Sequence, residues 1–133
     1  MDEQRYTLTI TLEDGPAEAE QRVRDALAAQ GFGVLSEIDV QAALRDKLGE
    51  EIGAYKILGA CNPPLASRAI AADADIGALL PCNVLLRANP DGGTDVAAAD
   101  PRAMLSLGAA GLEDVAAEAR ERIEAALAAL SEG

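Results

Sequence analysis

Apolar side chains alternate with threonine over residues 6–12, a period of two that is typical of a strand with one buried face. Gly15 and Pro16 break this pattern, and proline suits the first turn of a helix. Apolar side chains then recur every three or four residues until Gly31, where glycine favours a helix end. The pattern therefore predicts a strand followed by an amphipathic helix.

A second strand and helix are predicted in the next segment of the chain. Residues 32–38 form a short β-prone run, which indicates a strand. Asp39 suits the N-cap position of a helix, and the apolar residues after it keep helical spacing until Gly49. We therefore expect a helix over residues 40–48.

The segment 55–61 is apolar on both faces apart from Lys56. This composition predicts a central strand that is covered on both sides or nearly so. Asn62 and the two prolines after it end the strand abruptly. Because asparagine is a good N-cap and proline a good first helical residue, we expect a third helix over residues 65–73.

The remaining pattern predicts a hairpin and two further helices. Residues 79–88 indicate a strand, and a dense run of Asn, Pro, Asp and Gly returns the chain into a weaker, alanine-rich strand over 94–98. Asp100 and the proline after it begin a short helix through Leu107. The apolar spacing over residues 112–130 predicts a long amphipathic helix.

This order of elements predicts one compact α+β domain over residues 1–133, with a mixed, largely antiparallel sheet and helices packed on it. A chain of this length is common for a single domain and short for two. The antiparallel sheet is favoured because the hairpin closes the chain and most connections are short. A small doubly wound α/β sheet is the alternative.

Charge narrows the range of partners. The chain has 23 acidic and 11 basic residues and a net charge of −12, so phosphate backbones and anionic membrane surfaces would repel it. Aromatic residues make up only 2% of the chain, which leaves little surface for stacking bases. With neither a secretory signal pattern nor a membrane-spanning run, we expect a cytoplasmic protein with reduced cysteines and no nucleic-acid or membrane partner.

The sequence contains no histidine, which removes the usual general base at neutral pH and the triads that need imidazole. Gly31 and Gly33 follow a predicted helix, whereas the glycines of a nucleotide loop connect a strand to a helix. The acidic stretches have the spacing of solvated helix faces. We therefore assign no catalytic residue.

Two similar steps, Cys61-Asn62 and Cys82-Asn83, carry the remaining candidate chemistry. Cys61 precedes a predicted helix N-terminus, where free backbone N–H groups favour a thiolate, and Asn62 would serve as helix cap or as a hydrogen-bonding partner of a ligand. Three interpretations stay open: packing in the core, a small-molecule or redox thiol site, and a metal site formed by both cysteines. Two thiolates without histidine do not complete a tetrahedral metal site unless carboxylates or a second copy add ligands.

Three segments carry a resemblance to a known family: GFGVLSEIDV at 31–40, YKILGACNPPLA at 55–66, and the stretch 77–84 with its LPCNV motif. Together they resemble the bacterial and archaeal domain-of-unknown-function family 302 (DUF302), and the resemblance extends over nearly the whole chain. It implies a compact α+β domain that forms homodimers. It implies no catalytic residues.

We expect a cytoplasmic, dimeric binding module with a pocket for a small molecule or metal near Cys61, Asn62, Cys82 and Asn83. A thiol-dependent redox protein or enzyme is the first alternative, with Cys61 as the reacting thiol and Cys82 as its resolving partner. A purely structural interaction domain is the second. A homodimer is also expected because the alanine-rich apolar stripe of residues 112–130 could bury extra area between two copies.

Overall fold

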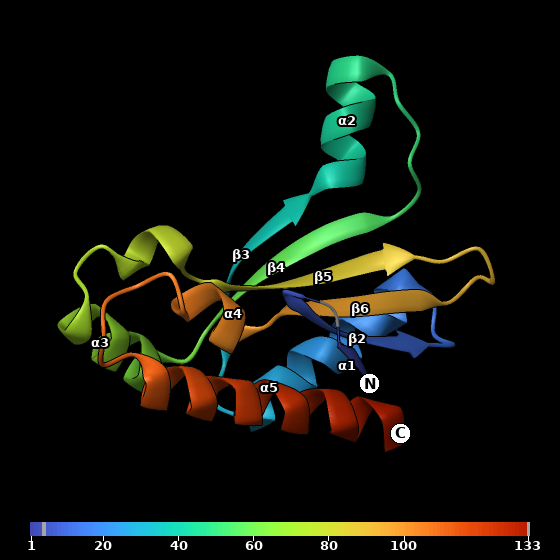
Figure 1. Ribbon diagram of the computed structural model, residues 1–133. Coiled ribbons are helices and arrows are strands. Elements are labelled where there is room, and N and C mark those ends of the chain that lie inside the picture. Colours follow the sequence, from blue (N-terminus) through green and yellow to red (C-terminus); the bar gives the residue numbers. More distant parts are fainter. Residues whose placement is uncertain (4, 133) are drawn as a thin grey trace.

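Figure 1 shows the computed structural model, which describes residues 1–3 and 5–132. Strands and helices alternate along most of this chain. In order, the elements are β1 (Asp2–Glu3), β2 (Thr7–Leu12), α1 (Pro16–Ala29), β3 (Gly33–Asp39), α2 (Val40–Leu48), β4 (Tyr55–Cys61), α3 (Pro63–Ala72), the short 3-10 helix η1 (Ile76–Leu79), β5 (Cys82–Ala88), β6 (Thr94–Ala99), α4 (Pro101–Leu105) and α5 (Glu113–Glu132).

The strands form one sheet in the order β1-β2-β6-β5-β4-β3, and every neighbouring pair is antiparallel. β5 and β6 are the predicted hairpin, and β2 joins the far side of β6 with Ile10 opposite Val96. The predicted α+β fold with an antiparallel sheet is confirmed. The doubly wound alternative is wrong because it needs parallel strands.

Capping residues begin or end several helices at the positions predicted from the sequence. The Asp39 side chain accepts a hydrogen bond from the Ala42 N–H at 2.9 Å and so caps α2. α2 ends at Leu48, and its C-cap residue Gly49 has a φ of 69°, in the left-handed region that favours glycine. Asp100 caps α4 in the same way, accepting from the Arg102 N–H at 2.9 Å.

Other boundaries differ from the predictions. α3 begins at Pro63, two residues before the predicted start, because Asn62 is its N-cap. Residues 76–79 form η1, so β5 starts only at Cys82 although a strand is predicted from residue 79. β1 is absent from the prediction because two residues are too few to give a periodic pattern.

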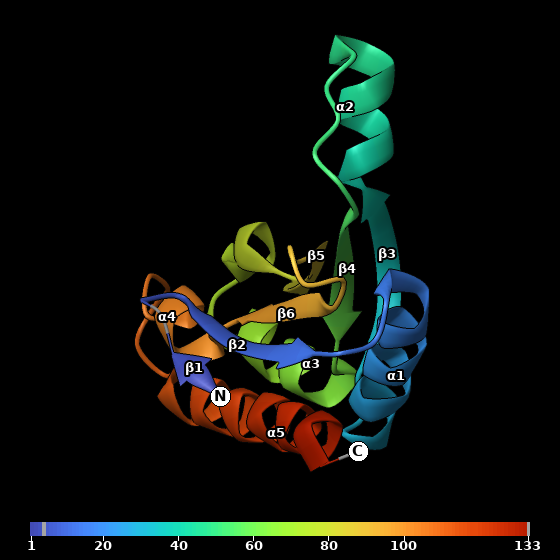
Figure 2. The ribbon, with the colours of Figure 1, turned by 90° about the vertical axis from the view of Figure 1, so that its right-hand side faces the viewer.

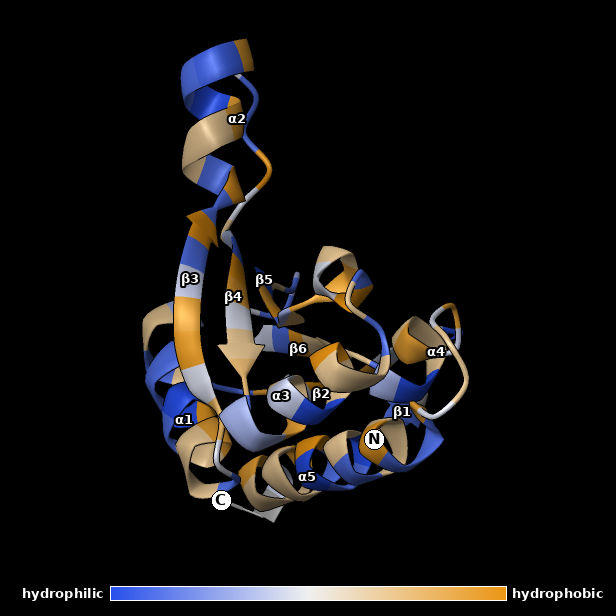
Figure 3. Cartoon of the chain, turned by 90° about the vertical axis from the view of Figure 1, so that its left-hand side faces the viewer, coloured by the Kyte–Doolittle hydropathy of each residue, from blue (hydrophilic) through white to orange (hydrophobic). Residues whose placement is uncertain are grey.

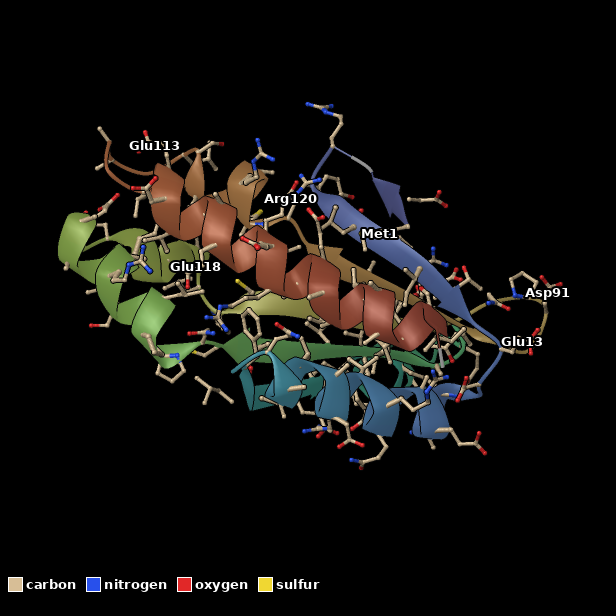
Figure 4. All side chains as sticks on the ribbon, turned by 90° about the horizontal axis from the view of Figure 1, so that it is seen from below. Met1, Glu13, Asp91, Glu113, Glu118 and Arg120 are labelled. Carbon is tan, nitrogen blue, oxygen red and sulfur yellow. The ribbon has the colours of Figure 1, made fainter. Side chains whose placement is uncertain are left out.

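The main core lies between one face of the sheet and the helices α1 and α5 (Figures 2 and 4). It is almost entirely aliphatic, since Phe32 is the one buried aromatic residue among the described side chains. The larger buried residues are Leu8, Ile10 and Leu12 from β2, Val84 and Leu86 from β5, Val96 from β6, and Ile123, Leu127 and Leu130 from α5.

The sequence predicts that β4 is covered on both faces or nearly so. In the structure, α1 and α5 cover only one of these faces. Leu58 faces α1 and α5 and is fully buried, whereas Tyr55 and Ile57 on the other face are only half-buried. The prediction is therefore confirmed for one face alone. Both long helices pack on the same side of the sheet, and the apolar pattern of one strand does not reveal this.

A second, smaller core connects α3, η1, α4 and the first turns of α5. Its buried side chains include Leu65 from α3, Ile76 from η1, Leu105 from α4, and Leu112 and Val115 near the start of α5. This core holds the long connection between β4 and β5 against the end of the sheet. None of the helices in the described residues has the length and apolarity needed to cross a bilayer.

Candidate functional site

Asn62 joins the end of β4 to the start of α3. Its Oδ1 accepts a hydrogen bond from the Leu65 N–H at 3.3 Å, and its Nδ2 donates to the Gln30 carbonyl at 3.3 Å. Only 7% of the residue is exposed. Both ends of the amide are thus occupied inside the fold, and the helix-cap interpretation of Asn62 is confirmed.

The turn between α1 and β3 packs directly on Asn62. Gly31 in this turn has a φ of +85°, and a Cβ at this position would lie 3.0 Å from the Asn62 Nδ2 atom. Backbone conformation and close approach therefore both favour glycine here. Arg122 of α5 donates to the same Gln30 carbonyl at 3.2 Å. These contacts fix α1, α3 and α5 relative to one another beside the cysteines.

A cavity of about 290 Å³ lies between α3, η1, the adjoining ends of β4 and β5, and α5. Apolar side chains form nearly all of its wall, among them Leu65 and Ala69 from α3 and Val115 from α5. Both cysteines line it as well. The cavity is thus an apolar space whose notable chemical groups are two thiols.

The two cysteines reach this cavity from neighbouring strands. Cys61 ends β4, and Cys82 begins β5 with its Cα opposite that of Ala60. Both residues are half-buried, and neither is in a disulfide. Burial raises the pKa of the Cys82 thiol to about 11, and the nearby Cys61 adds to the increase. Cys82 is therefore protonated at neutral pH.

Asn83 is the one predicted site residue that does not line the cavity. It is exposed, and its Cα pairs with that of Gly59 in the sheet. Successive side chains of a strand point to opposite faces, so Asn83 and Cys82 face opposite sides of the sheet. The similarity of the two Cys-Asn steps therefore does not extend to their surroundings.

Sequence reasoning misses most of the cavity wall. The apolar spacing of α3 could have indicated Leu65 and Ala69, but Leu105 and Val115 come from helices far along the chain. Leu35 and Ile70 also line the cavity, although 72% and 49% of these residues are exposed. They form an apolar rim at its opening.

A second hollow, of about 480 Å³, lies between α4 and the first half of α5. It is larger than the thiol cavity, but charged side chains such as Arg102, Glu113 and Asp114 contribute to its wall. Within residues 1–3 and 5–132, no three or more His, Cys, Asp or Glu side chains come together in a way that could hold a metal ion. The thiol cavity therefore remains the stronger candidate for a binding site.

Comparison with known proteins gives a family but no activity. A family model described as "Domain of unknown function DUF302" matches residues 8–130. A solved structure described as an uncharacterized conserved DUF302 protein from Bacillus stearothermophilus is 27% identical, with a TM-score of 0.84, and the match covers 92% of this chain and 95% of that one. No curated protein matches the chain.

Proposed function

The chain belongs to the DUF302 family of domains of unknown function, and from the geometry of its cavity we propose that it binds a small apolar molecule beside Cys61 and Cys82. The observation that carries this proposal is the apolar wall of a cavity of about 290 Å³. Ligand pockets commonly enclose roughly 300–1,000 Å³, so the ligand would be small.

The chemistry of the wall supports an uncharged ligand. The Asn62 amide is the main polar side chain at the cavity, and both of its ends are already hydrogen-bonded to the protein. A charged or strongly polar ligand would lose its hydration without gaining partners. We also propose a cytoplasmic location, because free thiols are typical of a reducing compartment.

A thiol-dependent redox function is the second candidate, favoured by two free cysteines on neighbouring strands at one cavity. In that function Cys61 would be the reacting thiol, because the raised pKa of Cys82 keeps the Cys82 thiol protonated. Metal binding would need ligands beyond these two thiols. Elemental analysis and native mass spectrometry of the purified protein would distinguish a bound metal from a bound organic molecule.

Toluene is a suitable probe of the cavity, since it is small, uncharged and apolar. We expect toluene to raise the melting temperature of the wild-type protein, because a ligand that binds only the folded state stabilises it. Ala66 of α3 lines the cavity, and Ala66→Phe should fill it and remove the effect. Ligand-observed NMR should show the same loss of binding.

The matched control is Ala71→Phe, which places the same side chain at an exposed position of the same helix, outside the cavity wall. This variant should keep the response to toluene. If toluene leaves the wild-type melting temperature unchanged, or if both variants respond equally, the proposed apolar site is wrong.

A further inference from the structure

An irregularity of the edge strand β3 holds Leu35 at the opening of the thiol cavity. Val34 pairs with Ala60 and Ser36 pairs with Gly59, so the register shifts and Leu35 is the extra residue of a β-bulge. Bulges re-aim side chains and are over-represented at sheet edges and next to active sites. Leu35 lines the cavity although 72% of the residue is exposed.

Ile70 of α3 forms the rest of the large apolar rim. It also lines the cavity, and 49% of the residue is exposed. Two large aliphatic side chains at one opening leave apolar area in contact with water, which is unfavourable. A ligand that extends out of the cavity would cover both of them.

The inner end of the cavity lies in the second core. Leu105 of α4 and Val115 and Ala119 of α5 line it there, and none of them is more than 6% exposed. Figure 3 shows α3 between β3 on one side and α4 on the other. The apolar wall therefore runs from an exposed rim to a buried end. The alanine-rich stripe of α5, from which a homodimer is expected, faces the interior of the single chain here.

The length and volume of this space suit an alkyl chain. A cavity of roughly 150 Å³ accommodates benzene, a ring of six carbons. The thiol cavity, of about 290 Å³, has about twice that volume. A chain of roughly ten carbons would fill it and reach both ends, which a single small ring would not.

The polar end of such a ligand has a place only at the rim. Among residues 1–3 and 5–132, no charged side chain lines the cavity, and both ends of the Asn62 amide are bonded to the backbone. A polar group inside would lose its hydration without gaining partners. Arg68, the basic residue of α3, is already paired with Glu118 at 2.9 Å. With a net charge of −12, the protein would also repel an anionic head group.

From this arrangement, we infer that the ligand is a single-chain amphiphile with an alkyl chain of roughly ten carbons and a polar head that is not anionic. The chain enters between Leu35 and Ile70, and its methyl end lies beside Leu105 and Val115. The head group stays in water at the rim. This inference rests on the proposed apolar site and specifies the class of molecule that the site binds.

A series of straight-chain primary alcohols from butanol to decanol tests the chain. Dissociation constants come from competition with toluene in ligand-observed NMR. Each added methylene should tighten binding by about fourfold while it is buried, and the gain should continue beyond hexanol. Decanoate has the same chain length as decanol, and at neutral pH it should bind several-fold more weakly because its head is anionic.

Leu35→Asn tests the rim. It should weaken decanol binding by about fourfold or more, because the outer part of the chain loses apolar contact, and it should leave toluene binding unchanged. Ile70→Asn should act in the same direction. The matched control is Leu107→Asn, since Leu107 is 75% exposed and lies outside the cavity wall. This variant should bind decanol as the wild type does.

The possible results separate this inference from the proposed function. If toluene binds but affinity does not increase from hexanol to decanol, the chain-shaped ligand is wrong and the apolar site stands. Equal weakening of decanol by Leu35→Asn and Leu107→Asn would likewise overturn the role of the rim, and decanoate binding as tightly as decanol would overturn the choice of head group. If neither toluene nor any alcohol binds, the proposed function itself is wrong.

Discussion

Cys61 and Cys82 line one cavity, yet their positions in the sheet are different. Cys61 is the last residue of β4 and lies directly before the cap of α3, whereas Cys82 is the first residue of β5. Burial raises the pKa of the Cys82 thiol to about 11 from an ordinary value of 9.0. The two thiols should therefore contribute differently to reactivity and to stability.

The raised pKa of Cys82 predicts a loss of stability at high pH. The unfolded chain loses this thiol proton near pH 9, while the folded protein keeps it until about pH 11. The stabilising contribution is complete below pH 9 and disappears as the pH rises towards 11. We expect the free energy of unfolding to fall by roughly 1–2 kcal/mol over this range on account of Cys82.

Urea unfolding of the wild type and of Cys82→Ala at several pH values measures this contribution. The difference between the two proteins cancels the titration of other groups, and it should shrink as the pH rises. Cys61→Ala is the control and should retain most of the wild-type loss, because burial is the larger cause of the raised pKa of Cys82 and Cys61 the smaller one. A pH profile of Cys82→Ala parallel to that of the wild type would falsify the assignment of a buried, protonated thiol.

Asn62 illustrates how one side chain joins several elements. Its amide caps α3 and also binds the last turn of α1 through the Gln30 carbonyl. The neighbouring Gly31 leaves room for this contact. Asn62 thus helps to position the cavity wall, while both of its side-chain polar atoms are hydrogen-bonded to the protein backbone.

At the scale of elements, two ion pairs of similar chemistry and different burial connect α5 to residues of other elements. Arg120 contacts Asp100 at the start of α4 at 2.7 Å, with 15% and 7% of the two side chains exposed. Glu118 contacts Arg68 of α3 at 2.9 Å, with 39% and 47% exposed. Figure 4 shows Arg120 and Glu118 on opposite flanks of α5. The two pairs connect α5 to different helices.

Breaking the buried pair should destabilise the protein far more than breaking the exposed pair. Arg120→Met leaves the Asp100 carboxylate buried without this partner, and we expect it to lower the free energy of unfolding by roughly 2–4 kcal/mol. Arg68→Met removes an exposed ion pair and should cost less than about 0.5–1 kcal/mol.

Urea denaturation of the two variants and the wild type measures their free energies of unfolding. Equal m-values would show that the substitutions change stability and not the surface exposed on unfolding. The substitution is the same in both variants. Arg120→Met also breaks the pair between Arg120 and the exposed Glu124, which is worth only about 0.3–0.5 kcal/mol. Equal destabilisation by the two variants would show that the junction of α4 and α5 does not depend on the buried pair.

At the scale of the whole molecule, the net charge of −12 opposes compaction. The ion pairs at Lys56 and Arg120 offset part of the repulsion locally, but acidic residues outnumber basic residues by about two to one. Added salt screens charges over longer distances more than it weakens buried pairs. Repulsion should therefore dominate the salt response.

We expect the melting temperature to rise between dilute buffer and about 0.5 M sodium chloride, where the Debye length is only a few ångströms. Differential scanning calorimetry at constant protein concentration measures this shift. Potassium chloride should give a similar rise, because screening depends on ionic strength. An unchanged or lower melting temperature would mean that long-range repulsion does not control stability.

The cavity shows which part of the candidate site is encoded locally. Cys61, Asn62 and Cys82 were identifiable because each lies beside a strand end or a helix-starting proline. Their companions Leu105 and Val115 were not, since nothing near them in the sequence indicates a shared wall. Asn83 was expected beside the cavity but does not line it, because a repeated dipeptide does not specify which face of a sheet its second residue occupies.

The sequence by itself determined the main strands and helices, because apolar periodicity, Asp and Asn caps, and glycine or proline breaks act over a few residues. Only the tertiary structure decided that β2 pairs with β6, that α1 and α5 share one face of the sheet, and that α2 projects from it. Such contacts join distant residues, as when Thr11 donates to Asp95 across 84 positions. A period of two or 3.6 places a side chain on a face but does not identify what packs against that face.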